Sequence, residues 1–173
     1  MKVALIIAPK DFKDETVAKA CSMLERWKVE PILASLSARE CIGAHGAEYR
    51  ASHQIKELKP ETLDAILVVD GEGFESFKLY DHMPLLDLMR EIAAEGKVVA
   101  GVGVGVKAIA KANIVSGKKI AVRKNTETER MVRLYKGVPS DEEIEAGSSI
   151  MSLSNSQRTE EFVGLMLDRL GVR

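Results

Sequence analysis

The feature that most constrains the fold is a set of apolar runs in which apolar and polar residues do not alternate. Residues 63–71 read LDAILVVDG, residues 97–102 read KVVAGV, and residues 2–8 read KVALIIA. A strand with one face in water alternates apolar and polar side chains, whereas a strand covered on both faces is apolar throughout. These runs therefore predict central strands of a sheet that is covered on both sides.

Helical patterns, with apolar side chains every three or four residues, stand between the predicted strands. They cover residues 15–27, 83–96, 106–112 and 157–171. Further strands are expected at residues 29–37, 118–124 and 149–154, and a β-hairpin that turns at Ala44–Gly46 is expected within residues 40–52. Residues 125–147 mix helix formers with Gly137 and Pro139, so this segment fits either one helix or two short pieces.

Strands that alternate with helices imply right-handed crossovers and a mainly parallel sheet. The expected fold is therefore a three-layer α/β/α sandwich with a small β-hairpin. Such folds bind ligands beyond the carboxyl ends of their strands.

Composition narrows the class of protein. The chain has 173 residues, 46% of them hydrophobic, which predicts one domain over residues 1–173. Its 25 basic and 26 acidic side chains nearly cancel, so nothing indicates a nucleic-acid partner or a membrane partner. The start lacks the pattern of a signal peptide, and no run approaches the ~18 apolar residues of a membrane helix, so a cytoplasmic location is expected.

The stretch KVVAGVGVGVKAIAKA, residues 97–112, places three glycines at every second position between a strand and a helix. A dinucleotide-binding fingerprint needs a third glycine where Val106 stands, and a phosphate-binding Walker loop needs a Gly-Lys-Ser/Thr ending that is absent. These glycines also fit a simpler role, because small residues let a strand and a helix pack closely. No cofactor is expected from this pattern.

Four segments in order resemble the DJ-one/ThiJ/PfpI superfamily, which has a flavodoxin-like sheet. Residues 1–17 are similar to its first strand and acidic loop, residues 42–71 to its hairpin and the strand that leads to a Gly-Gly turn. Residues 95–119 are similar to its nucleophile elbow, a turn that carries a cysteine between strand and helix, and residues 149–167 to its last strand and helix. The resemblance identifies the chain as a divergent member without the elbow cysteine.

The resemblance places Gly103 at the position of the nucleophilic cysteine and Val104 at the next. The family acid maps to Glu15, or to Lys13 if the segments are aligned on Phe12. The Gly-Gly turn, whose second amide helps to form an oxyanion hole, corresponds to Gly71–Glu72. A glycine cannot act as a nucleophile, and a carboxylate that points into an oxyanion hole opposes the charge that develops there.

The sequence positions of the other chemically active side chains predict structural roles. Cys21 lies on the apolar face of a helix and Cys41 within the hairpin, and they lack the spacing of a disulfide framework or a zinc site. The sequence also contains three histidines and a late serine cluster: His45, His53, His82, Ser152, Ser154 and Ser156. The histidines fit turn or surface positions, and the serines before the last helix more often cap it than attack a substrate.

The sequence therefore favours a pseudo-enzyme that binds a small anionic or carbonyl ligand, with Glu15, Gly71, Glu72, Gly103 and Val104 as candidate ligand-binding residues. The alternative is an active hydrolase or glyoxalase-like enzyme that uses another residue, with Glu15 as a candidate acid. A third option is a self-associating subunit. The resemblance implies a homodimer or larger homo-oligomer, and no metal site is expected.

Overall fold

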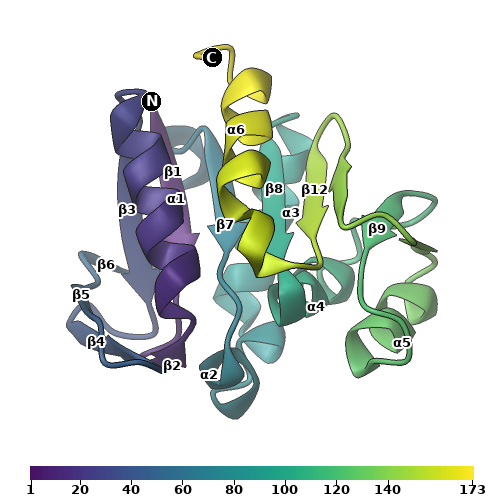
Figure 1. The fold of residues 1–173 in the computed structure, drawn as a ribbon, viewed down its shortest axis with the longest axis horizontal. Coiled ribbons are helices and arrows are strands. Elements are labelled where there is room, and N and C mark those ends of the chain that lie inside the picture. Colours follow the sequence, from purple (N-terminus) through teal and green to yellow (C-terminus); the bar gives the residue numbers. More distant parts are fainter.

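A seven-stranded sheet forms the centre of the computed structural model, which describes residues 1–173 (Figure 1). The strand order is β11-β12-β8-β7-β1-β3-β6, and every neighbouring pair is parallel except β11 with β12. The strands are β1 (Lys2–Ile6), β3 (Glu30–Ser35), β6 (His53–Gln54), β7 (Ala65–Val68), β8 (Val98–Val102), β11 (Ile144–Ala146) and β12 (Ile150–Leu153). The predicted mainly parallel sheet is confirmed.

Helices cover both faces of this sheet. One face carries α1 (Asp14–Arg26) and α6 (Thr159–Arg169), and the other carries α3 (Met83–Ala94) and α4 (Val106–Lys111) (Figure 1). The apolar core correspondingly has two large parts, one on each side of the sheet, and a third, smaller cluster that includes Phe12 and Cys41. All residues of β7 and β8 are buried, which explains why their sequences show no polar alternation.

A smaller three-stranded sheet contains the predicted hairpin. Its strands are β2 (Lys10–Phe12), β4 (Glu40–Gly43) and β5 (Glu48–Arg50), with β4 and β5 antiparallel. Gly46 has a φ of 88°, a backbone conformation that favours glycine, so the turn forms where the sequence predicted it. Strand β2, which pairs in parallel with β4, was not predicted.

The segment between α4 and β12 differs most from the sequence prediction. Strand β9 (Lys119–Ala121) forms within residues 118–124, but it pairs in parallel with β10 (Val138–Ser140) in a separate two-stranded sheet. The interval that fitted two readings contains one helix, α5 (Glu127–Leu134), followed by β10 and β11. The buried Ser152 hydroxyl accepts a hydrogen bond of 2.8 Å from the Ala121 amide and so connects β9 to the main sheet.

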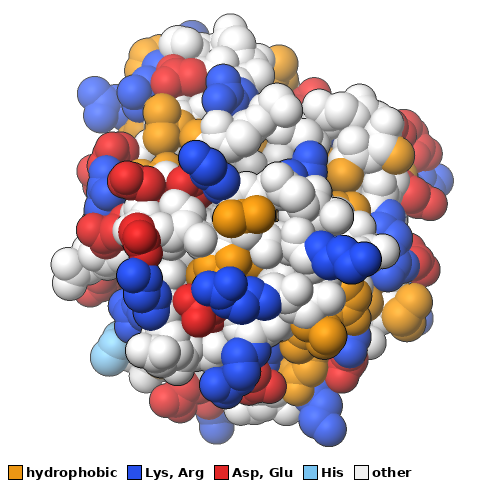
Figure 2. Space-filling model, turned by 90° about the vertical axis from the view of Figure 1, so that its right-hand side faces the viewer, with side chains coloured by type: hydrophobic (Ala, Val, Ile, Leu, Met, Phe, Trp, Pro, Cys, Tyr) orange, Lys and Arg blue, Asp and Glu red, His pale blue; other side chains and the backbone are white.

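Short helical turns complete the connections. Helix α2 (Glu72–Ser76) follows β7, and the single 3-10 turns are η1 (Ile55–Glu57), η2 (Pro60–Thr62), η3 (Leu79–Asp81), η4 (Gly103–Gly105) and η5 (Ser156–Arg158). The surface seen on the side that carries β9 and α5 shows basic and acidic side chains interspersed with apolar ones (Figure 2). None of the helices combines the length and the apolar character needed to cross a membrane.

Candidate functional site

A cavity of about 540 Å³ opens at the carboxyl edge of the sheet, the lower edge in Figure 1. Its walls come from the turns after three neighbouring parallel strands, β7, β8 and β12, and from the connection between β9 and α5. Because the carboxyl ends of parallel strands meet at one edge, residues far apart in the sequence converge there. Only two lining residues, Val104 and Val122, are hydrophobic, so most of the residue types around this cavity are polar, charged or glycine.

Gly103 occupies the tight turn between β8 and α4. Its φ of 53° lies in the left-handed region that side chains other than glycine rarely adopt. A Cβ atom built at this position would lie 3.2 Å from the Asp70 Cβ and 3.4 Å from the Asp70 Oδ2. The absence of a side chain at residue 103 therefore leaves the Asp70 carboxyl beside the apex of the turn.

Asp70 was not among the residues selected from the sequence. It follows β7, is 7% exposed, and its Oδ1 accepts a hydrogen bond of 2.8 Å from the Thr16 hydroxyl. Burial raises the pKa of Asp70, while the Thr16 hydrogen bond and the charges of Lys13 and Arg123 act in the opposite direction. This carboxyl is therefore the most strongly buried acid that lines the cavity.

Lys13 lies between Asp70 and the loop after β12. Its Nζ donates a hydrogen bond of 2.5 Å to the Ser156 hydroxyl and lies 4.0 Å from the Asp70 Oδ2. Its backbone N–H also donates to the Asp70 carbonyl at 3.0 Å. These contacts hold an ammonium group at the cavity wall, although a 4.0 Å separation from Asp70 is too long for a hydrogen bond.

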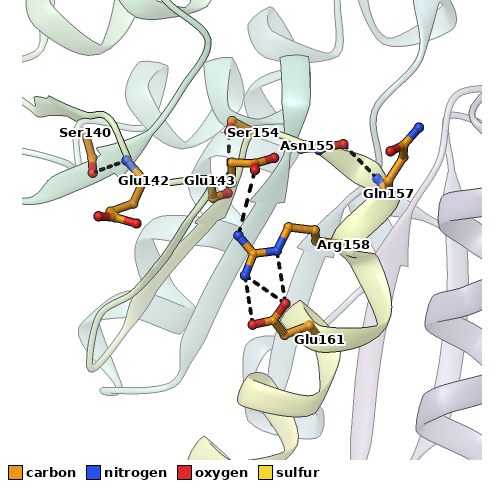
Figure 3. A network of polar contacts seen from close by, with 8 residues as sticks. All are labelled: Ser140, Glu142, Glu143, Ser154, Asn155, Gln157, Arg158 and Glu161. Carbon is orange, nitrogen blue, oxygen red and sulfur yellow. Dashed lines mark hydrogen bonds and ion pairs between the residues drawn. The ribbon is translucent and has the colours of Figure 1, made fainter.

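The loop that carries Ser154 and Ser156 is held by a polar network (Figure 3). Arg158 forms hydrogen bonds of 2.8–3.0 Å with Glu161 and approaches Glu143 at 4.0 Å. The Asn155 side-chain oxygen accepts a hydrogen bond of 3.1 Å from the backbone N–H of Gln157. Arg158 is thus fully engaged in holding the loop, whereas both serines line the cavity.

Arg123 and Glu72 bring charge to the cavity that no partner in the protein neutralises. The arginines that form ion pairs are Arg50, Arg90, Arg158 and Arg173, so Arg123 is not among them. Glu72 is exposed. Its backbone carbonyl accepts a hydrogen bond from the Ser76 hydroxyl, and its carboxylate forms no hydrogen bond with the protein. Both side chains line the cavity. Both side chains are exposed to solvent, so each charge is accessible to a ligand in the cavity.

Four of the five residues selected from the sequence line this one cavity: Gly71, Glu72, Gly103 and Val104. The fifth, Glu15, is exposed on α1 and does not line it. Lys13, the residue given by the other alignment, does line it. A shift of two residues at the start of α1, from Lys13 to Glu15, thus decides which side chain faces the cavity.

Gly71 is required by close packing. Its φ is 127°, and a Cβ atom would lie 2.6 Å from the Asp11 carbonyl oxygen and 2.8 Å from the Lys13 amide nitrogen. Any larger residue would push the chain that leads into α1 away from the turn after β7. Gly71 therefore positions both Asp70 and Lys13.

Neither cysteine lies at the cavity. Cys41 lies on strand β4 of the hairpin with its side chain buried, and burial raises its pKa. Cys21 lies on α1, where burial, together with the charge of Glu25, raises its pKa to about 11. Both thiols are therefore protonated at neutral pH and poor nucleophiles.

The three histidines also lie outside the cavity lining. His45 is in the hairpin turn, His53 shares a hydrogen bond of 2.8 Å with the Ser52 hydroxyl, and burial lowers the pKa of His82 before α3. No group of three or more histidine, cysteine, aspartate and glutamate side chains is arranged to hold a metal ion.

Two buried charges outside the cavity lining have protein partners. The Asp14 carboxylate accepts hydrogen bonds of 2.9 Å and 2.8 Å from the His45 and Ala47 amides, which holds the hairpin against α1. The Lys107 ammonium, on a side chain that is 1% exposed, lies 3.0 Å from both Glu75 carboxylate oxygens. It also lies 3.4 Å from Glu127 Oε2 and 4.4 Å from the centre of the Tyr80 ring.

The fold and the turn after β8 together define a flavodoxin-like α/β protein with a polar cavity at the carboxyl edge of its sheet. The family model described as "DJ-1/PfpI family" matches residues 1–157. The chain therefore belongs to the DJ-1/PfpI family.

Individual proteins are similar to this chain in sequence or in fold. The uncharacterized protein MJ0967 of Methanocaldococcus jannaschii is 31% identical over 121 residues, which cover 70% of this chain and 58% of that relative. Deglycase PH1704 of Pyrococcus horikoshii is 25% identical over 119 residues, 69% of this chain and 70% of that protein. The crystal structure of a ThiJ/PfpI domain protein from Brachyspira murdochii superposes with a TM-score of 0.90 at 20% identity, covering 99% of this chain and 97% of the other.

Proposed function

We propose that this chain is a non-catalytic member of the DJ-1/PfpI family that binds a small anionic or carbonyl ligand in the cavity at the carboxyl edge of its sheet. The observation that carries the proposal is Gly103, which stands at the turn where the family resemblance leads one to expect a cysteine. Covalent catalysis requires a nucleophilic side chain, and this turn offers only backbone.

The two native cysteines do not replace the missing thiol. The raised pKa of each disfavours the thiolate, which is the reactive form, and neither lines the cavity. A thiol mechanism would therefore require a large rearrangement of α1 or of the hairpin.

Binding remains well supported by the lining of the cavity. Lys13 and Arg123 supply positive charge, and the hydroxyls of Thr128, Ser154 and Ser156 supply hydrogen-bonding groups. An anionic group of the ligand is expected beside the two cations and away from Glu72, because like charges repel in a partly desolvated cavity.

An active enzyme that uses another residue is the second candidate. Two observations favour it: the relative from Pyrococcus horikoshii is named a deglycase, and Asp70 combines burial with a raised pKa beside the Lys13–Ser156 pair. Catalytic acids and bases often have such shifted pKa values. Under this candidate, Asp70→Asn and Ser156→Ala would each lower turnover without loss of the fold.

The two candidates are separated by an assay with methylglyoxal and a peptide substrate. The native protein and the Cys21→Ser/Cys41→Ser variant are both expected to show no turnover above buffer. Gly103→Cys is expected to add a thiol that reacts with iodoacetamide yet gives little or no turnover, because Glu72 and Val104 remain. Native turnover that Asp70→Asn abolishes would establish the second candidate instead.

Self-association is a further part of the proposal. We expect a homodimer or larger homo-oligomer, which size-exclusion chromatography with light scattering would measure. A stable oligomer without ligand binding or turnover would favour an assembly module whose cavity has no ligand. A monomer that binds ligand would leave the binding function intact and remove the assembly role.

A further inference from the structure

The cavity contains charges of both signs, and two of them, Arg123 and Glu72, form no ion pair in the protein. Arg123 has no ion-pair partner, whereas Lys13 donates to the neutral Ser156 hydroxyl and forms only a long ion pair, of 4.0 Å, with the Asp70 Oδ2. On the acidic side, Glu72 has no ion-pair partner, and Asp70 has one carboxylate oxygen bound to Thr16 and the other without a hydrogen bond in the protein. A ligand with one kind of charge would satisfy only half of these groups.

The sheet order separates these charges across the Gly103 turn. Asp70 and Glu72 follow β7, and Gly103 follows β8, which lies between β7 and β12. Arg123 follows β9, and β9 is joined to β12 by the Ala121–Ser152 hydrogen bond. The acidic wall and Arg123 therefore lie on opposite sides of the turn, with open space above the glycine.

The two walls also belong to one cavity. Asp70 and Arg123 form no direct ion pair, and both line this cavity. The Asp70 Oδ2 lies near the position of a side chain at residue 103, so it faces the space that Gly103 leaves free. A ligand placed there would adjoin the Asp70 carboxylate within the cavity that Arg123 also lines.

We propose that the cavity recognises a small zwitterion of the α-amino acid class, whose ammonium group contacts the Asp70 Oδ2 and whose carboxylate contacts Arg123. This inference rests on the proposed ligand-binding function and specifies its ligand. The planar guanidinium of an arginine matches a carboxylate with two parallel hydrogen bonds. Asp70 and Glu72 repel a ligand that carries only negative charge, so the ammonium group is what favours the zwitterion over a simple acid.

The volume of about 540 Å³ also fits this class, because binding cavities for small molecules begin at roughly 300 Å³. The space beyond Asp70 and Arg123 is lined by the hydroxyls of Thr126, Thr128 and Ser154 and by two valines. A polar side chain on the amino acid is therefore expected to bind better than a large aromatic one.

The test begins with the native full chain and the twenty common L-amino acids, each added singly at millimolar concentration and followed by amide chemical shifts in NMR spectra. The best binder is then compared with two matched analogues: the amine that lacks its carboxylate and the acid that lacks its ammonium group. We expect each analogue to bind about tenfold or more weakly, since a lost charge-assisted contact has an effect of this order.

Three variants assign the contacts. Asp70→Asn should weaken binding of the amino acid about tenfold and leave the acid analogue unchanged or bound more tightly. Arg123→Gln should weaken both. Arg50→Gln, a matched change at an exposed arginine of the hairpin, should alter neither. The analogue series in the native protein tests the inference even if a cavity variant does not fold.

The possible outcomes distinguish the zwitterion inference from the proposed ligand-binding function. Equal binding of the amino acid and the acid analogue, both weakened by Arg123→Gln, would overturn the zwitterion inference and leave the proposed anion-binding function standing. Binding of the amino acid that Asp70→Asn leaves unchanged would also overturn the inference. Turnover of a bound amino acid would contradict the non-catalytic proposal but support the ligand class. No binding by any amino acid or acid analogue would overturn the zwitterion inference and the proposal of an anionic ligand.

Discussion

Two buried aspartates show how one residue type serves the fold in one region and remains available to a ligand in another. The Asp14 carboxylate accepts hydrogen bonds from two hairpin amides. Burial raises its pKa, but these amides outweigh burial and hold the pKa below its ordinary value. Asp70 has one hydroxyl donor and no amide donor from another residue, so burial prevails and its pKa is raised.

The difference lies in how completely each charge is compensated. A carboxylate that accepts several backbone N–H bonds is stable when ionised and holds its neighbours in place. A buried carboxylate with a free oxygen costs stability when ionised, and such costs are concentrated at functional sites. Asp14 is therefore a structural residue of the hairpin, and Asp70 is the residue most available to a ligand.

The largest effect is expected at the structural aspartate. Asp14→Ala removes both hydrogen bonds and should lower the free energy of unfolding by about 2–4 kcal/mol in urea denaturation. The contribution of Asp14 is present above the pKa of an unfolded aspartate and is lost as pH falls through its lowered folded pKa. Glu15→Ala, the exposed neighbour in the same helical turn, should change stability by no more than about 0.5 kcal/mol. Equal effects would refute the structural assignment.

The second largest effect on stability is expected at Lys107, a buried cation that is paired with acidic side chains of the protein. Lys107→Met keeps the apolar length of the side chain but leaves Glu75 without its partner, so we expect a loss of about 2 kcal/mol. Lys111→Met, in which the more exposed lysine loses its 3.1 Å pair with Asp81, should cost less than about 1 kcal/mol. Thermal unfolding of both variants measures the difference. A larger loss for Lys111 would contradict the ranking by burial.

A smaller effect is expected at the turn itself. Gly103→Cys places a side chain at a φ of 53° and against Asp70, which should cost about 1–2 kcal/mol. Gly117→Cys is the matched control, because Gly117 has a φ of 72° and its added Cβ would meet no atom within 4 Å. The difference between the two variants measures the contact with Asp70. If Gly117→Cys is the more destabilising, the proposed contact is absent.

The smallest expected effect is an increase in stability. Asp70→Asn should raise stability at neutral pH by roughly 1 kcal/mol, or about 2–4 °C in Tm, because it removes the cost of burying an ionised carboxylate. A raised folded pKa means that native Asp70 gains stability as pH falls through that pKa, so the advantage of the variant should shrink in acid. Marked destabilisation at neutral pH would place Asp70 with Asp14 as a structural residue.

The sequence predicted the central architecture because its strongest patterns follow directly from burial and from backbone geometry. Runs such as residues 63–71 are apolar throughout when a strand is covered on both faces, and Gly96 and Gly46 mark a helix end and a turn through the backbone angles they allow. Short strands such as β2 and β10 have three residues each, too few for a period to be visible. Their formation depends on partners distant in the sequence.

The candidate site was only partly predictable for a related reason. The glycine turn identified Gly103 and the strand end identified Gly71, since backbone geometry leaves a local pattern. Whether Glu15 or Lys13 faces the cavity depends on a two-residue difference in alignment at the start of α1, which no local pattern fixes. Asp70 had a usable signal, an acidic residue directly after a buried strand at the edge where ligands bind, and this signal was overlooked.

The central claim is that the glycine turn supports binding without thiol chemistry. The most direct test measures methylglyoxal consumption by the native protein and by its Cys21→Ser/Cys41→Ser variant, with the fold of each verified by NMR. The account predicts a rate equal to that of buffer for both proteins. Rapid consumption by the native protein that the double variant loses would show that one of its thiols is catalytic and would contradict the account.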